Sequence, residues 1–452
     1  MRLDPSALVR DYVHRLPNAL SLLLLNCNKD PCRIFGPRYR HYRESIALRD
    51  GFDPVPVLKS VVGSALRDVP YYRKRDGNEI RIDTMEDFEN FIDFIDKDTV
   101  LENFDAFIST AVDLSDYDRG TTGGTSGKPL TLLAPKNRYA VELASMHSIW
   151  AGAGFNFDVR AVIRNHRLKQ DEYFRVNPFT REMIFDGFRL NDDYFAVMYN
   201  LMRHYRIRFL HCYPSVAYEF ANFLYDRKLD VSFMTAFLSG SENVFAYQKD
   251  LIQGRLGIRF YNWYGHSEKL ILAGNCPDSD LYHVEPAYGY FELIDSENHV
   301  IREPGKIGEM VGTAFHNPGM PLIRYRTGDF AEYVGERCPV CGRGATVIRN
   351  IVGRWSGDRI YNRDGSFVTT TALNLHTHLL SVISGLQYIQ REKGELEILI
   401  VKSPDYQASD DADFYRHFRE RLDPHTRVNI RYVDRLIRQP NGKFLHIISN
   451  VA

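Results

Sequence analysis

The sequence contains few cysteines and almost no net charge, and both facts narrow the classes of protein to which it can belong. Its 452 residues include only 6 cysteines, scattered along the chain, which argues against a disulfide framework and for a reducing cytoplasmic compartment. The 57 Lys and Arg residues are balanced by 58 Asp and Glu residues, leaving a formal net charge of −1. A near-neutral chain has no general electrostatic attraction for nucleic acid or an anionic membrane, so we expect neither as a partner.

The sequence also lacks a hydrophobic run long enough to cross a membrane. The longest apolar run covers residues 20–25, whereas a membrane span needs about 20 residues. Asp4 and Asp11 precede this run, and no small-residue cleavage site follows it, which argues against a signal peptide. We therefore expect residues 20–25 to form part of a core helix. No internal repeat or low-complexity tract is present, and the length predicts two or three globular domains.

The order of the predicted elements indicates an α/β fold. Most of the first hundred residues have the pattern of helices, including residues 85–94, where apolar side chains recur at helical spacing. From about 130 to 330, helical stretches alternate with short strand-like runs at residues 208–212, 236–238 and 258–261. Such alternation predicts a substantially parallel sheet with helices beside it.

A smaller α+β unit is predicted in the C-terminal part of the chain. Residues 395–402 and 428–433 have strand-like composition, and residues 411–422 have the pattern of an amphipathic helix. We place the boundary between two domains after Gly353, which gives an N-terminal domain of residues 1–353 and a C-terminal domain of residues 354–452.

Residues 119–129 read RGTTGGTSGKP and predict a phosphate-binding loop. Glycines let the backbone approach an anion closely, while hydroxyl groups and a lysine add donors and positive charge. The loop is not a Walker A motif, because Thr122 replaces its first glycine and Pro129 replaces its magnesium-binding hydroxyl. The predicted phosphate-binding residues are Thr121, Thr122, Gly123, Gly124, Thr125, Ser126, Gly127 and Lys128.

Further motifs follow, most of them close behind strand-like runs. Residues 239–242 read SGSE, residues 261–268 read YNWYGHSE, residues 324–329 read RYRTGD, and residues 353–358 read GRWSGD. A lysine, Lys443, ends the tetrapeptide PNGK. Ligands bind at the carboxyl ends of strands in open α/β sheets, so motifs in these positions favour a ligand site.

In this order, the motifs resemble those of the adenylate-forming enzymes, the acyl-CoA synthetases and their relatives. The chain is most similar to the phenylacetate–CoA ligase branch and the related capsule-biosynthesis ligase-like proteins. The resemblance implies a large N-terminal adenylate-forming domain and a small mobile C-terminal domain that rotates about Asp358. It also implies AMP-forming activation of a small carboxylic acid by ATP with Mg²⁺, transfer of the acyl group to CoA, and a homodimer.

The resemblance assigns roles to individual residues. Lys443, Glu268 and Lys128 would be catalytic: Lys443 would contact the acyl carboxylate, and Glu268 would hold Mg²⁺. Asp329 would accept hydrogen bonds from the ribose hydroxyls, and a tyrosine of the second motif would stack on adenine. The residues expected to bind ATP are Thr121, Thr122, Gly123, Gly124, Thr125, Ser126, Gly127, Ser241, Glu242, Tyr264, Asp329 and Arg354.

An acyl pocket is expected beside these groups. Aromatic side chains and a small glycine could form a flat slot that favours an aryl or arylalkyl acid, although aromatic residues of this kind also commonly belong to the core. The residues expected to line the slot are Phe237, Gly240, Trp263 and Gly265.

Four residues predict a structural zinc site. Cys338 and Cys341 form a C-x2-C pair followed by glycine, and Cys276 and His283 supply a second half with six residues between them. Three thiolates and one imidazole suit tetrahedral Zn²⁺ and leave no open position for chemistry. The alternative is that these cysteines are free thiols packed as small hydrophobic groups.

Two other functions remain open from the sequence. The acyl-adenylate could be transferred to an amine, a hydroxyl group or a carrier-protein thiol rather than to CoA. Alternatively, the chain could be a non-catalytic nucleotide-binding scaffold, although Glu268, Asp329 and Lys443 are all present.

Overall fold

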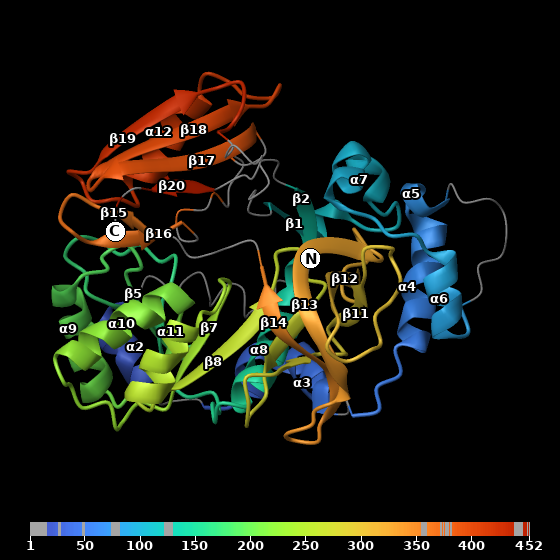
Figure 1. Ribbon diagram of the computed structural model, residues 1–452, viewed down its shortest axis with the longest axis horizontal. Coiled ribbons are helices and arrows are strands. Elements are labelled where there is room, and N and C mark those ends of the chain that lie inside the picture. Colours follow the sequence, from blue (N-terminus) through green and yellow to red (C-terminus); the bar gives the residue numbers. More distant parts are fainter. Residues whose placement is uncertain are drawn as a thin grey trace.

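The computed structural model contains one large sheet flanked by helices, and a smaller sheet that belongs to the C-terminal part of the chain (Figure 1). The structure describes residues 16–25, 29–47, 50–73, 82–121, 130–353, 359–370, 373, 375, 379, 382–437, 446–449 and 451.

The N-terminal part is helical, as expected. Its helices are α2 (Asn18–Leu24), α3 (Pro31–Ala47), α4 (Val55–Asp68), α5 (Pro70–Arg73), α6 (Met85–Phe91) and α7 (Lys97–Glu102). Helix α6 begins with a capping box: the Thr84 hydroxyl accepts from the Asp87 backbone N–H, and the Asp87 carboxylate accepts from the Thr84 N–H. This exchange satisfies two backbone donors that have no partner within the helix.

The apolar run at residues 20–25 forms a helix, but it is not a core helix. Leu20 and Leu23 are 43% and 72% exposed, and only Ser21 of α2 is buried. The helix lies beside the outermost strand of the large sheet, where the Asn18 side chain pairs with the backbone of Phe174 and Val176. Leu22 packs against the hydrophobic core while Leu20 and Leu23 are exposed, so the helix lies at the surface and the expectation of a core position is wrong.

The large sheet has twelve strands in the order β11-β12-β13-β14-β10-β9-β8-β7-β6-β3-β5-β4. Their bounds are β3 (Arg160–Ile163), β4 (Arg175–Asn177), β5 (Glu182–Phe185), β6 (Phe209–Cys212), β7 (Ala236–Gly240), β8 (Arg259–Gly265), β9 (Leu272–Asn275), β10 (Tyr282–Val284), β11 (Gly289–Ile294), β12 (Ile307–Ala314), β13 (Tyr325–Arg337) and β14 (Gly344–Val352). The three strand-like runs predicted between residues 208 and 261 are confirmed as β6, β7 and β8.

The parallel pairs lie together in one part of this sheet. Strands β5, β3, β6, β7 and β8 pair in parallel, and helices cover both of their faces. These helices are α8 (Tyr139–Ala151), α9 (Asp192–His204), α10 (Pro214–Asp226) and the short α11 (Ala246–Lys249). Because side chains alternate along a strand, Phe237 and Phe260 pack with residues of α9 and α10, whereas Leu238 and Tyr261 pack with residues of α8.

The remaining pairs of the large sheet are antiparallel. Strands β9, β10, β14, β13, β12 and β11 continue the sheet from β8 in this way, and β4 pairs antiparallel with β5 at the other edge. The sheet is therefore mixed, and parallel pairing is confined to about half of it. Parallel pairing was predicted from an alternation of helices and strands. No α-helix lies between β8 and β14, so this alternation ends at β8.

A separate two-stranded hairpin lies before α8 in the chain. Strands β1 (Tyr117–Thr121) and β2 (Thr131–Pro135) pair antiparallel, with Thr121 opposite Thr131. The predicted phosphate loop is thus the connection of a β-hairpin. Residues 122–129 of that loop lie outside the described residues.

The C-terminal part forms an α+β unit, as expected. Hairpin β15 (Arg359–Tyr361) and β16 (Phe367–Thr369) precedes a sheet in the order β19-β18-β17-β20. Its strands are β17 (Ile383–Glu392), β18 (Glu395–Lys402), β19 (Arg427–Tyr432) and β20 (Ile447–Ser449), and helix α12 (Asp410–Arg419) connects β18 to β19. The predicted strands at 395–402 and 428–433 and the predicted helix at 411–422 are confirmed, each within three residues.

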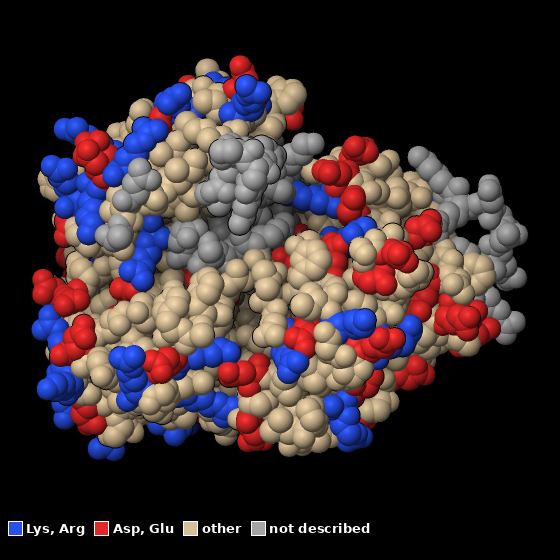
Figure 2. Space-filling model, in the orientation of Figure 1, with Lys and Arg blue, Asp and Glu red and all other residues tan. Residues whose placement is uncertain are grey.

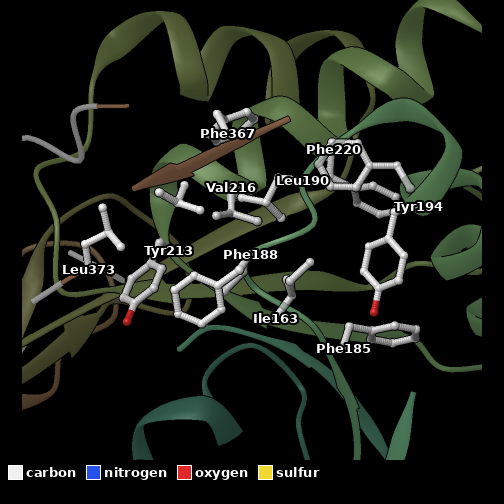
Figure 3. Packing of buried hydrophobic residues seen from close by; sticks show 14 of the residues in the cluster. Ile163, Phe185, Phe188, Leu190, Tyr194, Tyr213, Val216, Phe220, Phe367 and Leu373 are labelled. Atoms are coloured by element: carbon white, nitrogen blue, oxygen red, sulfur yellow. The ribbon is translucent and has the colours of Figure 1, made fainter. Parts of the chain in front are cut away.

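One hydrophobic cluster joins the large sheet's helices to the C-terminal unit. Phe367 of β16 lies beside Leu190, Val216 and Phe220 (Figure 3), and its backbone N–H donates to the Leu190 carbonyl oxygen at 3.3 Å. The same cluster continues through Leu373 into the four-stranded sheet. Hairpin β15–β16 therefore lies between helices α9 and α10 on one side and the small sheet on the other (Figure 1).

No helix in the described ranges is both long and apolar enough to span a bilayer. Acidic and basic side chains both occur across the visible face of the molecule (Figure 2).

Candidate active site

A cavity of about 1010 Å³ lies where strands β3, β6, β7 and β8 end, between hairpin β1–β2 and strands β13 and β14. This is the edge of the parallel strands at which ligands bind in open α/β sheets. Seven of the residues predicted to bind nucleotide, metal or acid line it: Ser241, Glu242, Trp263, Tyr264, Gly265, Glu268 and Asp329.

Tyr264 and Asp329 come from two different motifs and meet in this cavity. The Tyr264 hydroxyl donates to Asp329 Oδ2 at 2.8 Å. Burial, together with the neighbouring Asp329 carboxylate, raises the pKa of Tyr264 well above its ordinary value. The phenol therefore keeps its proton and remains a donor, which fixes the orientation of the carboxylate at the cavity wall.

A turn within β13 places Asp329 in the cavity. Gly328 has a φ of 72°, a conformation that glycine adopts without the steric cost of a side chain, and its N–H donates to Glu309 Oε1. The Thr327 hydroxyl donates to the Met310 carbonyl oxygen at 2.7 Å and accepts from the Asp329 N–H at 3.1 Å. The T-G-D motif is thus a defined backbone turn, and the hydrogen bonds of the Thr327 side chain stabilise it.

Glu268 is a buried carboxylate with two side-chain neighbours. His266 Nε2 accepts from the Ile271 backbone N–H, so its Nδ1 carries the hydrogen and donates to Glu268 Oε2 at 2.9 Å. The Tyr325 hydroxyl donates to Oε1 at 3.3 Å. These contacts fix the carboxylate in one orientation at the cavity wall.

The S-G-S-E motif forms the loop that leaves β7. Ser241 has a φ of 73°, which turns the chain sharply after the strand. Glu242 Oε2 accepts from the Ser215 backbone N–H at 3.0 Å, in the first turn of α10. Because the positive end of a helix dipole favours a carboxylate, this contact holds the loop in place.

Asn243 was missed by the sequence analysis. Its side chain donates to the Gly353 carbonyl oxygen at 3.1 Å and accepts from the Gly353 N–H at 2.8 Å. A matched pair of hydrogen bonds thus connects the loop after β7 to the first residue of the predicted hinge motif. The only sequence signal is that Asn243 directly follows the S-G-S-E motif.

The residues expected in the acyl pocket lie in two places. Trp263 and Gly265 line the cavity. A Cβ on Gly240 would lie 2.5 Å from the Trp263 ring, so Gly240 allows the indole to lie against β7. Phe237 does not line the cavity: it is 0% exposed and packs 6.1 Å from Phe220 in the core. The alternative of a core position therefore applies to Phe237.

Two basic groups in the cavity were not predicted. Arg164 follows β3 directly, and its guanidinium lies 4.5 Å from the centre of the Tyr213 ring. Lys269 pairs with Glu142 at 2.7 Å, and Glu142 also accepts from the Tyr288 hydroxyl at 2.8 Å. Their partners come from distant parts of the chain, so no local motif marks them.

Other predicted residues lie outside the part of the chain that the structure describes. Thr121 ends strand β1, but its side chain is not among the described ones. The residues outside are Thr122, Gly123, Gly124, Thr125, Ser126, Gly127, Lys128, Arg354, Asp358 and Lys443.

The four predicted metal ligands form one cluster, and none of the four lines the cavity. The ligand atoms of Cys276, His283, Cys338 and Cys341 all lie within 4.8 Å of one another. Cys276 Sγ and Cys338 Sγ are 3.8 Å apart, and Cys341 Sγ is 3.7 Å from His283 Nε2. They connect the end of β9 and strand β10 to the turn between β13 and β14.

These distances fit a zinc ion. Four ligands at tetrahedral corners, with Zn–S bonds of about 2.3 Å, stand about 3.8 Å from each other. The cluster supplies three sulfur atoms and one imidazole nitrogen, the donor set that Zn²⁺ prefers in structural sites.

Comparison with known proteins gives concordant results. The family model of the CapK C-terminal domain matches residues 360–450. Protein CapK of Staphylococcus aureus is 22% identical over 369 residues, which cover 79% of each chain. Phenylacetate-coenzyme A ligase of Thermus thermophilus is 27% identical over 203 residues, which cover 44% of this chain and 45% of that protein.

A solved structure shares the fold. A 2-hydroxyisobutyryl-CoA ligase, in complex with 2-HIB-AMP and CoA, superposes with a TM-score of 0.56 at 17% identity, covering 87% of this chain and 88% of that one. The motifs, their convergence on one cavity and these relatives agree. The chain is thus similar in sequence to protein CapK and to a phenylacetate-coenzyme A ligase, its C-terminal part matches the CapK C-terminal domain, and it shares the fold of an adenylate-forming CoA ligase.

Proposed function

We propose that this protein uses ATP to convert a carboxylic acid into an acyl-adenylate, and then transfers the acyl group to CoA. The observation that carries the proposal is the convergence of separate motifs: Tyr264, Glu268 and Asp329 all line one cavity, and two of them are in direct contact. A volume of about 1010 Å³ accommodates a nucleotide and a small acid together.

The nucleotide would lie at the Tyr264–Asp329 end of the cavity. A carboxylate accepts hydrogen bonds from the two ribose hydroxyls, and the aromatic ring of Tyr264 offers a surface for adenine. Ser241 and Glu242 lie on the neighbouring strand end, and Gly353, which precedes Arg354, also lines the cavity. In this proposal Arg354 and residues 121–127 complete the ATP site.

Glu268 fits a magnesium ion. Mg²⁺ prefers carboxylate oxygens and binds through one or two of them together with substrate phosphates. The Glu268 carboxylate lines the cavity in a fixed orientation. When bound there, Mg²⁺ would neutralise negative charge on the ATP phosphates.

In the first step, a carboxylate oxygen of the acid bonds to the α-phosphorus of ATP, and the bond from that phosphorus to pyrophosphate breaks. The chain contributes positioning and electrostatic stabilisation. Lys443 would donate to the acyl carboxylate, and Lys128 with the backbone of its loop would bind the β- and γ-phosphates. Both lysines lie outside the described residues, so their roles stay predictions from the sequence.

In the second step, the thiol sulfur of CoA bonds to the acyl carbon, AMP leaves with the electrons of the broken bond, and the thiol proton is released. The C-terminal domain would rotate about Asp358 between the steps. We therefore expect Asp358→Pro to retain pyrophosphate release with hydroxylamine as the acyl acceptor while thioester formation stops. Equal loss of both half-reactions would contradict this role for Asp358.

We further propose an aryl or arylalkyl acid as the substrate. Trp263 lies flat against Gly240 and lines the cavity beside Tyr213. Such flat aromatic walls favour a planar group through stacking and burial of apolar surface. Phe237 plays no part in this slot.

The test is pyrophosphate release with ATP and Mg²⁺ across a panel of aryl, arylalkyl, fatty and amino acids, with and without CoA. Release for one acid class, coupled to consumption of CoA thiol, is the expected result. A second outcome is pyrophosphate release that is stimulated by an amine or a carrier protein and not by CoA. That result would show that the protein forms the acyl-adenylate but transfers the acyl group to another acceptor. No release with any acid, while ATP still binds, would favour the non-catalytic scaffold.

We also propose that the Cys276–His283–Cys338–Cys341 cluster binds a structural zinc ion. Four protein ligands leave no open position, so the ion would connect two loops rather than take part in the reaction. The homodimer and the cytoplasmic location implied by the sequence stay predictions.

A further inference from the structure

Arg164 is a positively charged group in the cavity whose hydrogen-bond partners are all neutral. Its Nη1 lies 2.8 Å from His211 Nε2, and its Nη2 donates to the Ser241 hydroxyl at 2.9 Å. The guanidinium also lies over the Tyr213 ring. Within the described part of the chain, no carboxylate lies within 4.0 Å of it.

His211 and Tyr213, the two rings in contact with the Arg164 guanidinium, are uncharged. A guanidinium can only donate, so His211 Nε2 accepts and the ring is in its neutral form. Burial, together with the nearby arginines, lowers the pKa of His211 well below its ordinary value. Burial raises the pKa of Tyr213, so its hydroxyl keeps its proton and donates to Asn165 Oδ1 at 3.0 Å. The full positive charge of Arg164 thus faces the cavity.

Some basic residues of the cavity pair with carboxylates, whereas Lys136 and Arg138 donate to the backbone carbonyl oxygens of Ser115 and Lys269. Lys249 pairs with Asp280 at 2.8 Å, and Lys269 pairs with Glu142 at 2.7 Å. Glu242, on the loop beside Ser241, is instead held by the first turn of α10. An arginine that is fixed by three contacts, has further N–H groups and forms no ion pair with the described residues is preorganised to bind an anionic group.

The backbone of Arg164 lies apart from Tyr264, although its partner Ser241 is also expected to bind ATP. It follows β3, whereas Tyr264 belongs to β8, three strands further along the sheet. With neighbouring strands about 4.8 Å apart, the two backbone positions are about 14 Å from each other. Trp263 precedes Tyr264 on β8, and its ring lies 5.8 Å from the Arg164 guanidinium. An acid that lies along Trp263 would extend from the nucleotide end towards Arg164.

We propose that Arg164 binds a second anionic group of the acid substrate, so that the preferred substrate is an aromatic acid with another carboxylate across the ring. This inference rests on the proposed function, because it extends the acid site of that reaction. It makes Arg164 a specificity-determining residue, and it assigns His211 and Ser241 the task of holding the guanidinium in place.

The experiment compares matched pairs of acids in pyrophosphate release: benzoate against isophthalate and terephthalate, and phenylacetate against 1,4-phenylenediacetate. The proteins are the natural chain, Arg164→Gln and Arg164→Lys. The matched control is Arg208→Gln, which removes a surface arginine that pairs with Asp158 at the opposite end of β6. Binding of the same acids is followed in parallel by the thermal shift of each protein with a non-hydrolysable ATP analogue.

We expect the natural chain to prefer the diacids, and Arg164→Gln to lose roughly 10- to 100-fold in kcat/KM for them, as for a hydrogen-bonded charge pair. Its activity with the monoacids should stay within about threefold, which also shows that the variant is folded. Arg164→Lys should recover part of the diacid preference, since it keeps the charge but not the planar fork. Arg208→Gln should behave as the natural chain.

Two results would overturn the inference and leave the proposed function intact: equal activity of the natural chain with monoacids and diacids, or an equal loss for both in Arg164→Gln. The second result would place Arg164 at the activated carboxylate or at the nucleotide. If no acid supports pyrophosphate release, the proposed function fails, and the thermal shifts decide the binding role: a stabilisation by diacids that Arg164→Gln abolishes supports it, and its absence rejects it.

Discussion

The two ends of the cavity differ in charge and in how their residues are held. At the end proposed to bind nucleotide, formed by Tyr264, Glu268 and Asp329, two carboxylates are oriented by neutral donors. At the acid end, formed by Arg164, Tyr213 and Trp263, a cation is oriented by neutral groups. Acceptors at one end suit ribose hydroxyls and a metal ion, whereas a cation at the other suits an anionic part of the acid. Substitutions at one end should therefore change the KM for ATP, and substitutions at the other end should change the activity with different acids.

The largest effect is expected from the residue that is proposed to contact the reacting atoms. Lys443→Ala should reduce the rate of adenylation roughly 10²-fold or more, the scale of removing one donor that stabilises charge in the transition state. Pyrophosphate release under saturating ATP and acid measures it. KM for both substrates should change little. An unchanged rate would show that Lys443 does not contact the reacting groups.

A change at the nucleotide end should weaken ATP binding and spare the acid. Asp329→Ala removes the carboxylate that accepts from Tyr264 and is proposed to accept from the ribose, so KM for ATP should rise roughly 10- to 100-fold. The matched control is Glu336→Ala, on the same strand, where the carboxylate accepts from the Thr346 hydroxyl at 2.8 Å and does not line the cavity. A rise in KM for the acid instead of ATP would reverse the assignment of the two ends.

The cysteine cluster lies away from both ends, so its loss should change stability without changing substrate preference. Cys338→Ser should abolish an equimolar zinc content, measured by mass spectrometry of the purified protein, and should lower Tm by about 5 °C or more. The control is Cys32→Ser, which removes a cysteine outside the cluster. Natural protein that contains no zinc and does not respond to a strong chelator would support the free-thiol alternative.

The smallest effect is expected from the contact between Tyr264 and Asp329. Tyr264→Phe keeps the ring and removes the hydroxyl that donates at 2.8 Å. The affinity for ATP should fall about three- to tenfold, which is the usual effect of losing one hydrogen bond. Tyr333→Phe, which removes a hydroxyl that donates to Glu336 outside the cavity, is the control. Equal ATP affinity in both variants would mean that the hydrogen bond from Tyr264 to Asp329 does not contribute to ATP binding.

The meeting of Tyr264, Glu268 and Asp329 in one cavity could be predicted because these residues belong to short motifs. Each motif combines a turn with a carboxylate, as in the Thr327–Asp329 turn, so local sequence identifies both the geometry and the chemistry. The C-terminal strands and helix could be predicted for a similar reason, since their hydrophobic pattern is local.

The acid end could not be predicted in this way. The partners of Arg164 lie 47 and 77 residues further along the chain, on other strands. Phe237 was assigned to the pocket because it precedes a motif, but strand alternation turns it towards α10. With helices on both faces of the sheet, the sequence of a fully buried strand does not show which face leads to the cavity.

The antiparallel part of the large sheet was missed for a related reason. Its strands are joined by turns rather than helices, and β13 and β14 pair through repeated register shifts that blur the period of two. The exposed helix α2 shows the converse: an apolar run predicts burial only when a second element covers it.

The central claim is that an acid oxygen attacks the α-phosphorus of ATP in this cavity. The most direct test uses an acid labelled with ¹⁸O in the carboxylate to be activated, taken from those that support pyrophosphate release, with ATP, Mg²⁺ and CoA. The account predicts one ¹⁸O atom in each AMP formed, because the oxygen that bonds to phosphorus leaves with AMP when the thioester forms. Unlabelled AMP, or ADP with labelled phosphate, would contradict it.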